Sequence, residues 1–143
     1  MSHYEKIWWL KQNSLGGMPQ PPLEEIPYLY NKGLRAIASF LEAPDNLDQY
    51  KINKIDACWI PVEDDLAPSR EQLEEFAKFV NKMKAEKKPL AVHCKGGNGR
   101  AGTMLAGYFI LEDEDANYTL KWIREINPKA VRTLAQEEFL KNL

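Results

Sequence analysis

Two kinds of hydrophobic pattern alternate along this chain. Short, bulky apolar runs of strand length cover residues 6–10, 34–40, 57–62 and 89–93. Between and after these runs, apolar residues recur at the spacing of amphipathic helices over residues 23–33, 69–88, 100–111, 120–126 and 134–143. A short helix is also predicted over 46–53, and the glycine- and proline-rich stretch 13–22 is predicted to form turns.

This alternation of strands and helices predicts an α/β fold with a mostly parallel central sheet and helices on both faces. The helix after Ser69 has a defined start, because Ser69 and Gln72 have the spacing of a capping box. No repeat, low-complexity tract or linker interrupts the sequence, so we expect residues 1–143 to form one domain. Ligands of such sheets bind at the carboxyl ends of the strands, where we look for chemistry.

Composition and charge exclude several classes of protein. The 143 residues are 44% hydrophobic and 28% charged, which is typical of a globular chain. A formal net charge of −2 argues against a dedicated nucleic-acid binder. The opening segment has too short an apolar part for a secretion signal, and the longest uncharged apolar run, 101–111, is too short to span a bilayer. We therefore expect a cytoplasmic location and no membrane insertion.

Cysteine and histidine are scarce. The chain has two cysteines, Cys58 and Cys94, and two histidines, of which His93 precedes Cys94. Two cysteines can build neither a disulfide framework nor a four-cysteine zinc site. We expect no metal and no cofactor.

The most informative segment is 93–103, with the sequence HCKGGNGRAGT. Cys94 stands where a predicted strand ends, and the glycine-rich loop after it opens a helix, so backbone N–H groups and the helix dipole favour the thiolate. Arg100 adds a planar fork that suits phosphate oxygens. An anion held by the loop would lie directly over the sulfur. The predicted phosphate-binding residues are Lys95, Gly96, Gly97, Asn98, Gly99 and Arg100.

Two other interpretations of this segment are less favoured. A core cysteine before a flexible turn would contain the same residue types, but the strand, the three glycines, His93 and the following helix together favour a nucleophile. The loop also lacks the Gly-Lys-Ser/Thr ending of a nucleotide-binding phosphate loop.

Segment 93–103 resembles the active-site loop of the cysteine-dependent protein tyrosine phosphatases, especially their small dual-specificity branch. Three further segments resemble this family in its order along the chain: the glycine-proline turn at 15–19, the acid loop at 60–69 and the C-terminal signature at 130–140. The low-molecular-weight phosphatases carry a similar loop at the N-terminus, whereas here it lies about two-thirds along the chain.

The resemblance implies a role for each site residue. Cys94 would attack phosphorus, and Arg100 and the loop amides would hold the phosphate oxygens. Asp64, three residues after a proline, would protonate the leaving group, with Glu63 and Asp65 as reserves. Water would then hydrolyse the phosphocysteine. The supporting residues would be His93, which orients the loop and helps to keep the thiolate, and Thr103 and Gln136.

Gln136 has two equally weighted interpretations. The resemblance implies that it holds the hydrolytic water, whereas its spacing from Thr133 fits a capping box. Cys58 also has two: a core cysteine, which we favour, or a protective disulfide partner of Cys94.

The chain departs from the family pattern at several positions. Ala101 replaces the Ser or Thr that usually follows the arginine, which predicts slow breakdown of the phosphoenzyme unless Thr103 compensates. The sequence Asn-Pro-Lys at 127–129 replaces the common Arg-Pro-Gly and would alter the rim of the pocket. Lys95 directly follows Cys94, which resembles phosphoinositide-cleaving relatives that carry a lysine directly after the nucleophile.

These observations predict a phosphatase that acts on phosphotyrosine in proteins with some activity on phosphoserine and phosphothreonine, and we expect it to be a monomer. The alternatives are a phosphoinositide or small-molecule phosphatase, favoured by Lys95, and a phosphate-binding pseudophosphatase, suggested by Ala101. A chain of this length has little room for the insertions that deepen a pocket, so we expect a shallow, permissive site.

Overall fold

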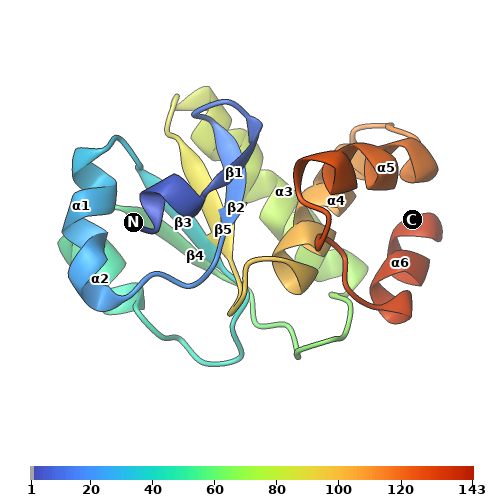
Figure 1. Ribbon diagram of the computed structural model, residues 1–143, viewed down its shortest axis with the longest axis horizontal. Coiled ribbons are helices and arrows are strands. Elements are labelled where there is room, and N and C mark those ends of the chain that lie inside the picture. Colours follow the sequence, from blue (N-terminus) through green and yellow to red (C-terminus); the bar gives the residue numbers. More distant parts are fainter. Residues whose placement is uncertain (1) are drawn as a thin grey trace.

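The computed structural model describes residues 2–143 (Figure 1). Its strands are β1 (Trp8–Lys11), β2 (Leu15–Met18), β3 (Ala36–Ser39), β4 (Asp56–Trp59) and β5 (Leu90–His93). Its helices are α1 (Ile26–Asn31), α2 (Leu47–Ile52), α3 (Arg70–Ala85), α4 (Gly99–Leu111), α5 (Ala116–Ile126) and α6 (Leu134–Lys141), with short 3₁₀ turns at Tyr4–Lys6 and Leu23–Glu25.

The strands form one sheet in the order β1-β2-β5-β3-β4. Only β1 and β2 pair antiparallel, and all other pairs are parallel. Helices α1 and α2 lie on one side of the sheet, and α3 to α6 lie on the other (Figure 1). The predicted α/β architecture with a mostly parallel sheet is therefore confirmed.

The prediction of turns over 13–22 was wrong for Leu15–Met18, which form the inner strand β2. Glycine weakens a strand in isolation, but here it permits close packing. A Cβ on Gly17 would lie 2.4 Å from the Trp8 ring, and one on Gly16 would lie 2.8 Å from the Trp8 carbonyl oxygen. The strand forms because these glycines let β1 and its tryptophan approach.

Strand β4 also differs from the prediction of a buried strand over 57–62. It lies at the edge of the sheet, and its side chains alternate between half-buried and exposed. An edge strand has a neighbouring strand on one side only, so its side chains are covered less completely than those of the inner strands. Trp59 is 37% exposed, and its indole N–H donates to the Leu41 carbonyl oxygen at 2.8 Å.

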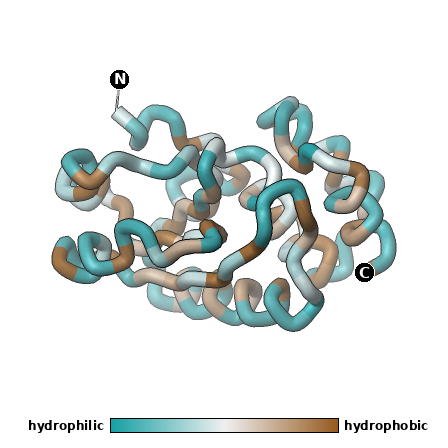
Figure 2. The backbone as a smooth tube through the Cα atoms, turned by 90° about the horizontal axis from the view of Figure 1, so that it is seen from below, coloured by the Kyte–Doolittle hydropathy of each residue, from teal (hydrophilic) through white to brown (hydrophobic). Residues whose placement is uncertain are grey.

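Two hydrophobic cores cover the two faces of the sheet. Alternate residues of one strand enter different cores: Leu90 and Val92 of β5 contact the core under α3 and α4, and Ala91 contacts the core under α1 and α2. In Figure 2 the hydrophobic positions, in brown, follow the strands and helices, whereas most connecting turns are hydrophilic. The sheet therefore presents rigid strand ends to the loops that follow β4 and β5.

Candidate active site

The predicted nucleophile lies at the carboxyl end of the central strand β5. Cys94 directly follows the strand, and α4 begins five residues later at Gly99. Cys94 is 3% exposed and Arg100, in the first turn of α4, is 5% exposed. The loop between them places the thiol in front of the N-terminus of a 13-residue helix, which favours negative charge at this position.

Gly97 fixes the shape of this loop. Its φ of +81° lies in the left-handed region, and a Cβ there would lie 2.4 Å from the carbonyl carbon and oxygen of Met18. The Gly97 carbonyl oxygen accepts a hydrogen bond of 3.0 Å from the Trp8 indole N–H. The loop is thus held against β1 and β2, and only glycine fits at this point.

His93 connects the loop to α2 through a buried network of hydrogen bonds. Its Nδ1–H donates to the Cys94 carbonyl oxygen at 3.1 Å, and its Nε2 accepts from the Tyr50 hydroxyl at 2.8 Å. The Asn46 amide in turn donates to the Tyr50 hydroxyl at 3.3 Å. Burial lowers the pKa of His93 to about 4, so the imidazole is neutral at pH 7. It holds the loop by hydrogen bonds and not through a positive charge beside the thiol.

Arg100 is anchored by hydrogen bonds through one nitrogen and has no hydrogen-bond partner at another. Its Nη1 donates to the carbonyl oxygens of Val62, at 3.0 Å, and Phe40, at 3.4 Å. Its Nε is buried and has no hydrogen-bond partner. A buried cationic N–H without a partner is unfavourable, so an anion bound in front of Arg100 would be stabilised.

The acid loop between β4 and α3 brings one carboxylate to this arginine. The Asp64 Oδ1 lies 3.6 Å from the Arg100 Nε, and the Asp64 side chain is 63% exposed. Asp65 has a φ of +65°, and its backbone N–H donates to the Asp64 Oδ1 at 3.0 Å. Asp65 itself pairs with Arg132, at 3.7 Å. Of the three acidic candidates, the structure places Asp64 at the site and directs Asp65 to the rim.

A cavity of about 280 Å³ joins these groups. Its lining residues are Asp64, Cys94, Lys95, Gly96, Asn98, Gly99, Arg100 and Arg132. The structure thus brings together the predicted nucleophile, arginine, acid and most of the loop. Four further residues lie behind this surface and support it: His93, Gly97, Thr103 and Gln136.

Thr103 and Gln136 are both engaged in backbone hydrogen bonds. The Thr103 hydroxyl donates to the Gly99 carbonyl oxygen at 2.7 Å. Its proton is therefore not directed to the Cys94 sulfur, so in this arrangement Thr103 does not compensate for Ala101. Gln136 forms the predicted capping box with Thr133, and its amide also donates to the Leu66 carbonyl oxygen at 3.2 Å. Gln136 therefore ties the acid loop to α6.

Three residues of the site were missed in the sequence. Trp8 and Tyr50 reach the loop from 89 and 43 positions away along the chain, and no local pattern indicates such contacts. Arg132 lies on the cavity wall because the capping box at Thr133 fixes the segment before α6. One indication of this position was present in the sequence, because Arg132 directly precedes the predicted helix start at Thr133.

Cys58 lies in β4, two strands from Cys94. Both Cys58 and Val92 pair with Ala38, so Cys58 and Val92 are about 10 Å apart, and Cys94 is two residues further along. A disulfide requires Cα atoms within roughly 7 Å. Burial raises the pKa of the Cys58 thiol to about 11, which keeps it protonated at pH 7. This position favours a packing role for Cys58.

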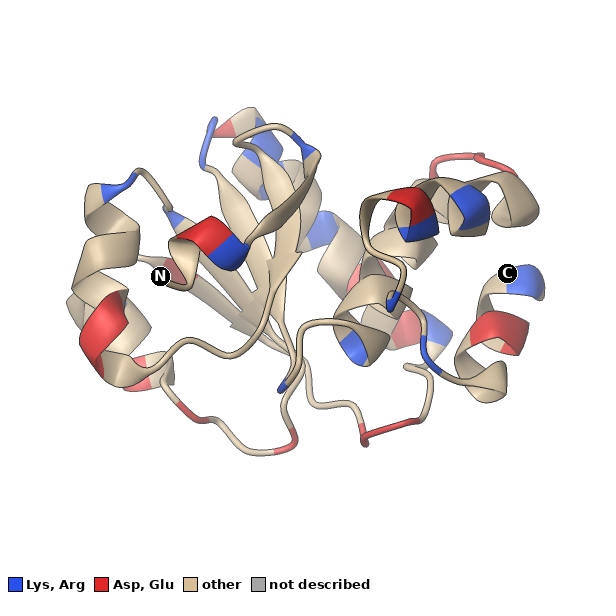
Figure 3. Ribbon diagram, in the orientation of Figure 1, with Lys and Arg blue, Asp and Glu red and all other residues tan. Residues whose placement is uncertain are grey.

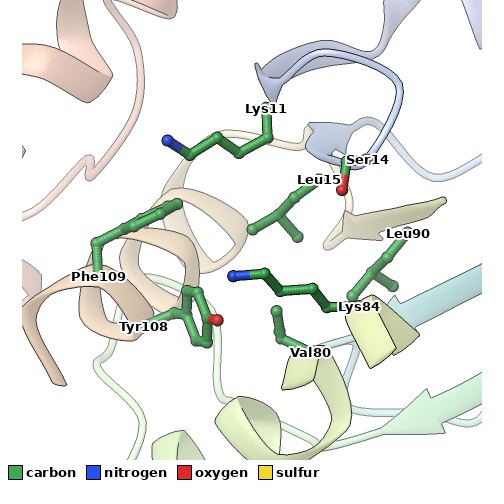
Figure 4. Close-up of a pocket in the computed structure, with 8 residues that line it drawn as sticks. All are labelled: Lys11, Ser14, Leu15, Val80, Lys84, Leu90, Tyr108 and Phe109. Atoms are coloured by element: carbon green, nitrogen blue, oxygen red, sulfur yellow. The ribbon is translucent and has the colours of Figure 1, made fainter. Parts of the chain in front are cut away.

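A second, smaller cavity lies at the amino ends of two inner strands, β2 and β5 (Figure 4). It has a volume of about 70 Å³ and adjoins Leu15 and Leu90, the first residues of β2 and β5. No cysteine, histidine or carboxylate is among its eight lining residues.

No helix within residues 2–143 is long and apolar enough to cross a membrane.

The sequence profile of a protein family matches residues 14–114, which include Asp64, Cys94 and Arg100. This family is described as "Polymorphic toxin system, DSP-PTPase phosphatase". The chain belongs to the DSP-PTPase phosphatases. A solved structure, Tk-PTP in its active form, has 26% sequence identity to this phosphatase and superposes with a TM-score of 0.90 over 98% of this chain and 97% of that one. The cysteine-dependent protein tyrosine phosphatase superfamily, predicted from segment 93–103, is confirmed.

Curated relatives extend the comparison to lipid phosphatases. The phosphatidylglycerophosphate phosphatase PTPMT1 of Arabidopsis thaliana is 28% identical over 139 residues, covering 90% of this phosphatase and 40% of the relative. A putative tyrosine phosphatase of Invertebrate iridescent virus 6 is 34% identical over 94 residues, covering 62% of this phosphatase and 34% of the relative. The chain thus spans less than half of either relative.

Proposed function

We propose that this chain hydrolyses phosphate monoesters through a phosphocysteine on Cys94, with phosphotyrosine in proteins as its substrate class. The observation that carries the proposal is the buried Nε of Arg100, which has no hydrogen-bond partner and lies in the same cavity as Cys94 and Asp64. A phosphate in this cavity would accept hydrogen bonds from Arg100 and the loop amides, and its phosphorus would face the sulfur.

The reaction takes two balanced steps. In the first step the Cys94 thiolate attacks phosphorus, the bond to the ester oxygen breaks, and Asp64 transfers its proton to the leaving oxygen. In the second step water attacks the phosphocysteine, Asp64 takes one of its protons, and inorganic phosphate leaves with the thiolate restored. Arg100 and the loop amides stabilise the negative charge on the transferred group in both steps.

Two observations support phosphotyrosine. The thiol is almost fully buried, so the phosphate must reach the floor of the cavity, and a tyrosine phosphate extends further from its backbone than a serine phosphate. The similarity to Tk-PTP covers nearly the full length of both chains. Because Cys94, Arg100 and Asp64 line one cavity, we favour an enzyme over a phosphate-binding pseudophosphatase.

A second candidate substrate is a phosphorylated lipid headgroup. The Arabidopsis thaliana relative is named a phosphatidylglycerophosphate phosphatase. Lys95 is exposed beside the nucleophile, and the cavity has no aromatic side chain among its lining residues. A polar wall of this kind suits a hydroxylated headgroup as well as it suits a peptide.

Aryl phosphate hydrolysis measured against pH would test the mechanism. We expect Cys94→Ser to abolish turnover and Asp64→Asn to lower kcat by about 10²- to 10⁴-fold. Glu63→Gln is the matched control, because Glu63 is an adjacent exposed acid outside the cavity. Turnover that survives in Cys94→Ser would overturn the covalent mechanism. A kcat/KM more than tenfold higher for phosphoinositides than for phosphotyrosine peptides would favour the second candidate.

A further inference from the structure

The cavity of about 70 Å³ lies at the amino end of β5, whereas Cys94 follows the carboxyl end of the same strand. Four residue steps along the chain separate Leu90, at the cavity, from Cys94, which is about 13 Å. Residues of α3 and α4 complete its walls (Figure 4). No residue lines both this cavity and the catalytic one, so the two are separate.

The walls of this cavity are mainly hydrophobic. Five of its eight lining residues are apolar or aromatic: Leu15, Val80, Leu90, Tyr108 and Phe109. The first four are no more than 5% exposed and belong to the core under α3 and α4. Side chains around a void lack the dispersion contacts that a bound hydrocarbon group would supply. Apolar voids in proteins can therefore bind small hydrocarbon groups.

Two lysines also line the cavity, and no carboxylate lines it with them. Lys11 ends β1, and Lys84 lies in the last turn of α3. Figure 4 shows their side chains on either side of Leu15, with both nitrogen ends toward Tyr108 and Phe109. Within residues 2–143 neither ammonium group enters an ion pair of 4 Å or less. Both positive charges are therefore available to a ligand.

The Lys11 ammonium group contacts aromatic rings and still has donors to offer. It lies 5.8 Å from the Phe109 ring centroid and 5.7 Å from the Trp122 ring centroid. An ammonium group has three N–H donors, so these contacts leave room for an anion. Glu114 lines an adjoining hollow with Lys11 but forms no ion pair of 4 Å or less with it. Figure 3 shows basic positions at this end of the sheet on β1, on α3 and on the turn before β5.

We propose that this cavity binds a short branched carboxylate, whose hydrocarbon end packs between the core residues while its two oxygens accept from Lys11 and Lys84. Hydrogen bonds between ionised groups are stronger than neutral ones, and each oxygen can take one ammonium donor. The volume limits the hydrocarbon end. Because a water molecule occupies about 30 Å³ in the liquid, the cavity has room for about two or three carbon atoms of similar size. The inference goes beyond the proposed function, since this site lies apart from the catalytic cavity.

Titration with 3-methylbutanoate tests the site. We expect a Kd of about 1 mM, as befits a ligand of about seven non-hydrogen atoms. At a concentration tenfold above Kd the ligand should raise Tm by about 3–6 °C. Acetate lacks the branched hydrocarbon and 3-methylbutan-1-ol lacks the charge, so each should bind at least fivefold more weakly. In NMR spectra the backbone amides of Leu90 and Tyr108 should shift.

Variants of the lining residues locate the ligand. Lys11→Gln and Lys84→Gln should each raise Kd at least threefold, and Lys84→Arg should retain most of the affinity. Val80→Leu adds a carbon to the cavity and should raise Kd at least fivefold without changing any charge. Lys82→Gln is the matched control, because Lys82 is exposed on the same helix and lines neither this cavity nor the catalytic one. The Tm of each variant without ligand reports whether its fold is intact.

Each contrary result overturns a defined part of the proposal. Equal Kd values for 3-methylbutanoate and acetate would remove the hydrocarbon end from the cavity. NMR shifts confined to residues 94–100 would place the carboxylate in the catalytic cavity. A Kd more than tenfold lower for N-acetyl-glycyl-leucine would assign the site to the carboxyl terminus of a peptide and overturn the small-molecule assignment. Aryl phosphate turnover decides the proposed function separately, so this site and that function can fail independently.

Discussion

Replacing Gly97 by alanine would disturb the catalytic loop at its tightest point. The new Cβ would lie 2.4 Å from the Met18 carbonyl carbon and oxygen and 2.6 Å from the Pro19 nitrogen. These are backbone atoms at the end of β2, which is paired on both sides, so they cannot rotate away as a flexible side chain would. The loop itself must move by about 1 Å to restore ordinary van der Waals contact.

The energetic cost has two parts. The left-handed backbone of Gly97 is unfavourable for alanine by roughly 1–2 kcal/mol. Steric overpacking adds about 1–3 kcal/mol. We therefore expect Gly97→Ala to lower the free energy of unfolding by about 2–5 kcal/mol. Because a displacement of about 1 Å at a reacting group can cost on the order of 100-fold in rate, kcat/KM should fall by about that factor.

Urea unfolding followed by tryptophan fluorescence and aryl phosphate hydrolysis would measure the two effects. Gly96→Ala is the matched control for stability, because its Cβ would meet nothing closer than the Asn98 side chain at 3.6 Å and its φ is not in the left-handed region. If Gly97→Ala were as stable as Gly96→Ala and kept wild-type kcat/KM, the steric argument would be refuted.

Three further predictions follow from the buried network and the start of α4. Tyr50→Phe leaves the buried His93 Nε2 without its hydrogen-bond donor, so urea titration should show that the free energy of unfolding falls by about 1–3 kcal/mol. The control Tyr118→Phe, at an exposed position of α5, should lower it by less than about 0.5 kcal/mol. Burial lowers the folded-state pKa of His93 to about 4, so below pH 6.5 the unfolded chain binds the proton more readily. Stability should therefore decrease by about 3 kcal/mol as the pH falls from 6.5 to 4, and His93→Gln should lose this slope. Ala101→Ser should speed breakdown of the phosphoenzyme. Rapid-quench kinetics with no burst in the wild type and unchanged turnover in the variant would refute this.

Much of the site could be predicted because its central part is contiguous. Segment 93–103 holds the nucleophile, the glycines and the arginine, and their order encodes a strand end, a tight loop and a helix start. The capping boxes at Ser69 and Thr133 were equally readable, since each depends on residues three positions apart. Residues that interact at a short, fixed spacing form motifs that can be recognised in a sequence.

Strand β2 shows where local reasoning failed. Its two glycines have low strand propensity and predicted turns, but their missing side chains make room for Trp8 of β1. The prediction for strand β4 failed in the opposite way: its apolar residues predicted a buried strand, but it lies at the sheet edge. Burial and pairing depend on neighbouring strands, which propensity does not include.

The sequence by itself determined the architecture, the thiol, the arginine and the loop between them, because each depends on residues close together in the chain. Only the tertiary structure decided which acid faces the cavity, since Asp64, Asp65 and Glu63 are alike in sequence and differ in where their loop directs them. It also decided that Trp8 and Arg132 meet at the same loop from opposite ends of the chain. Such contacts arise when the sheet brings distant segments to one edge, and no spacing rule records them.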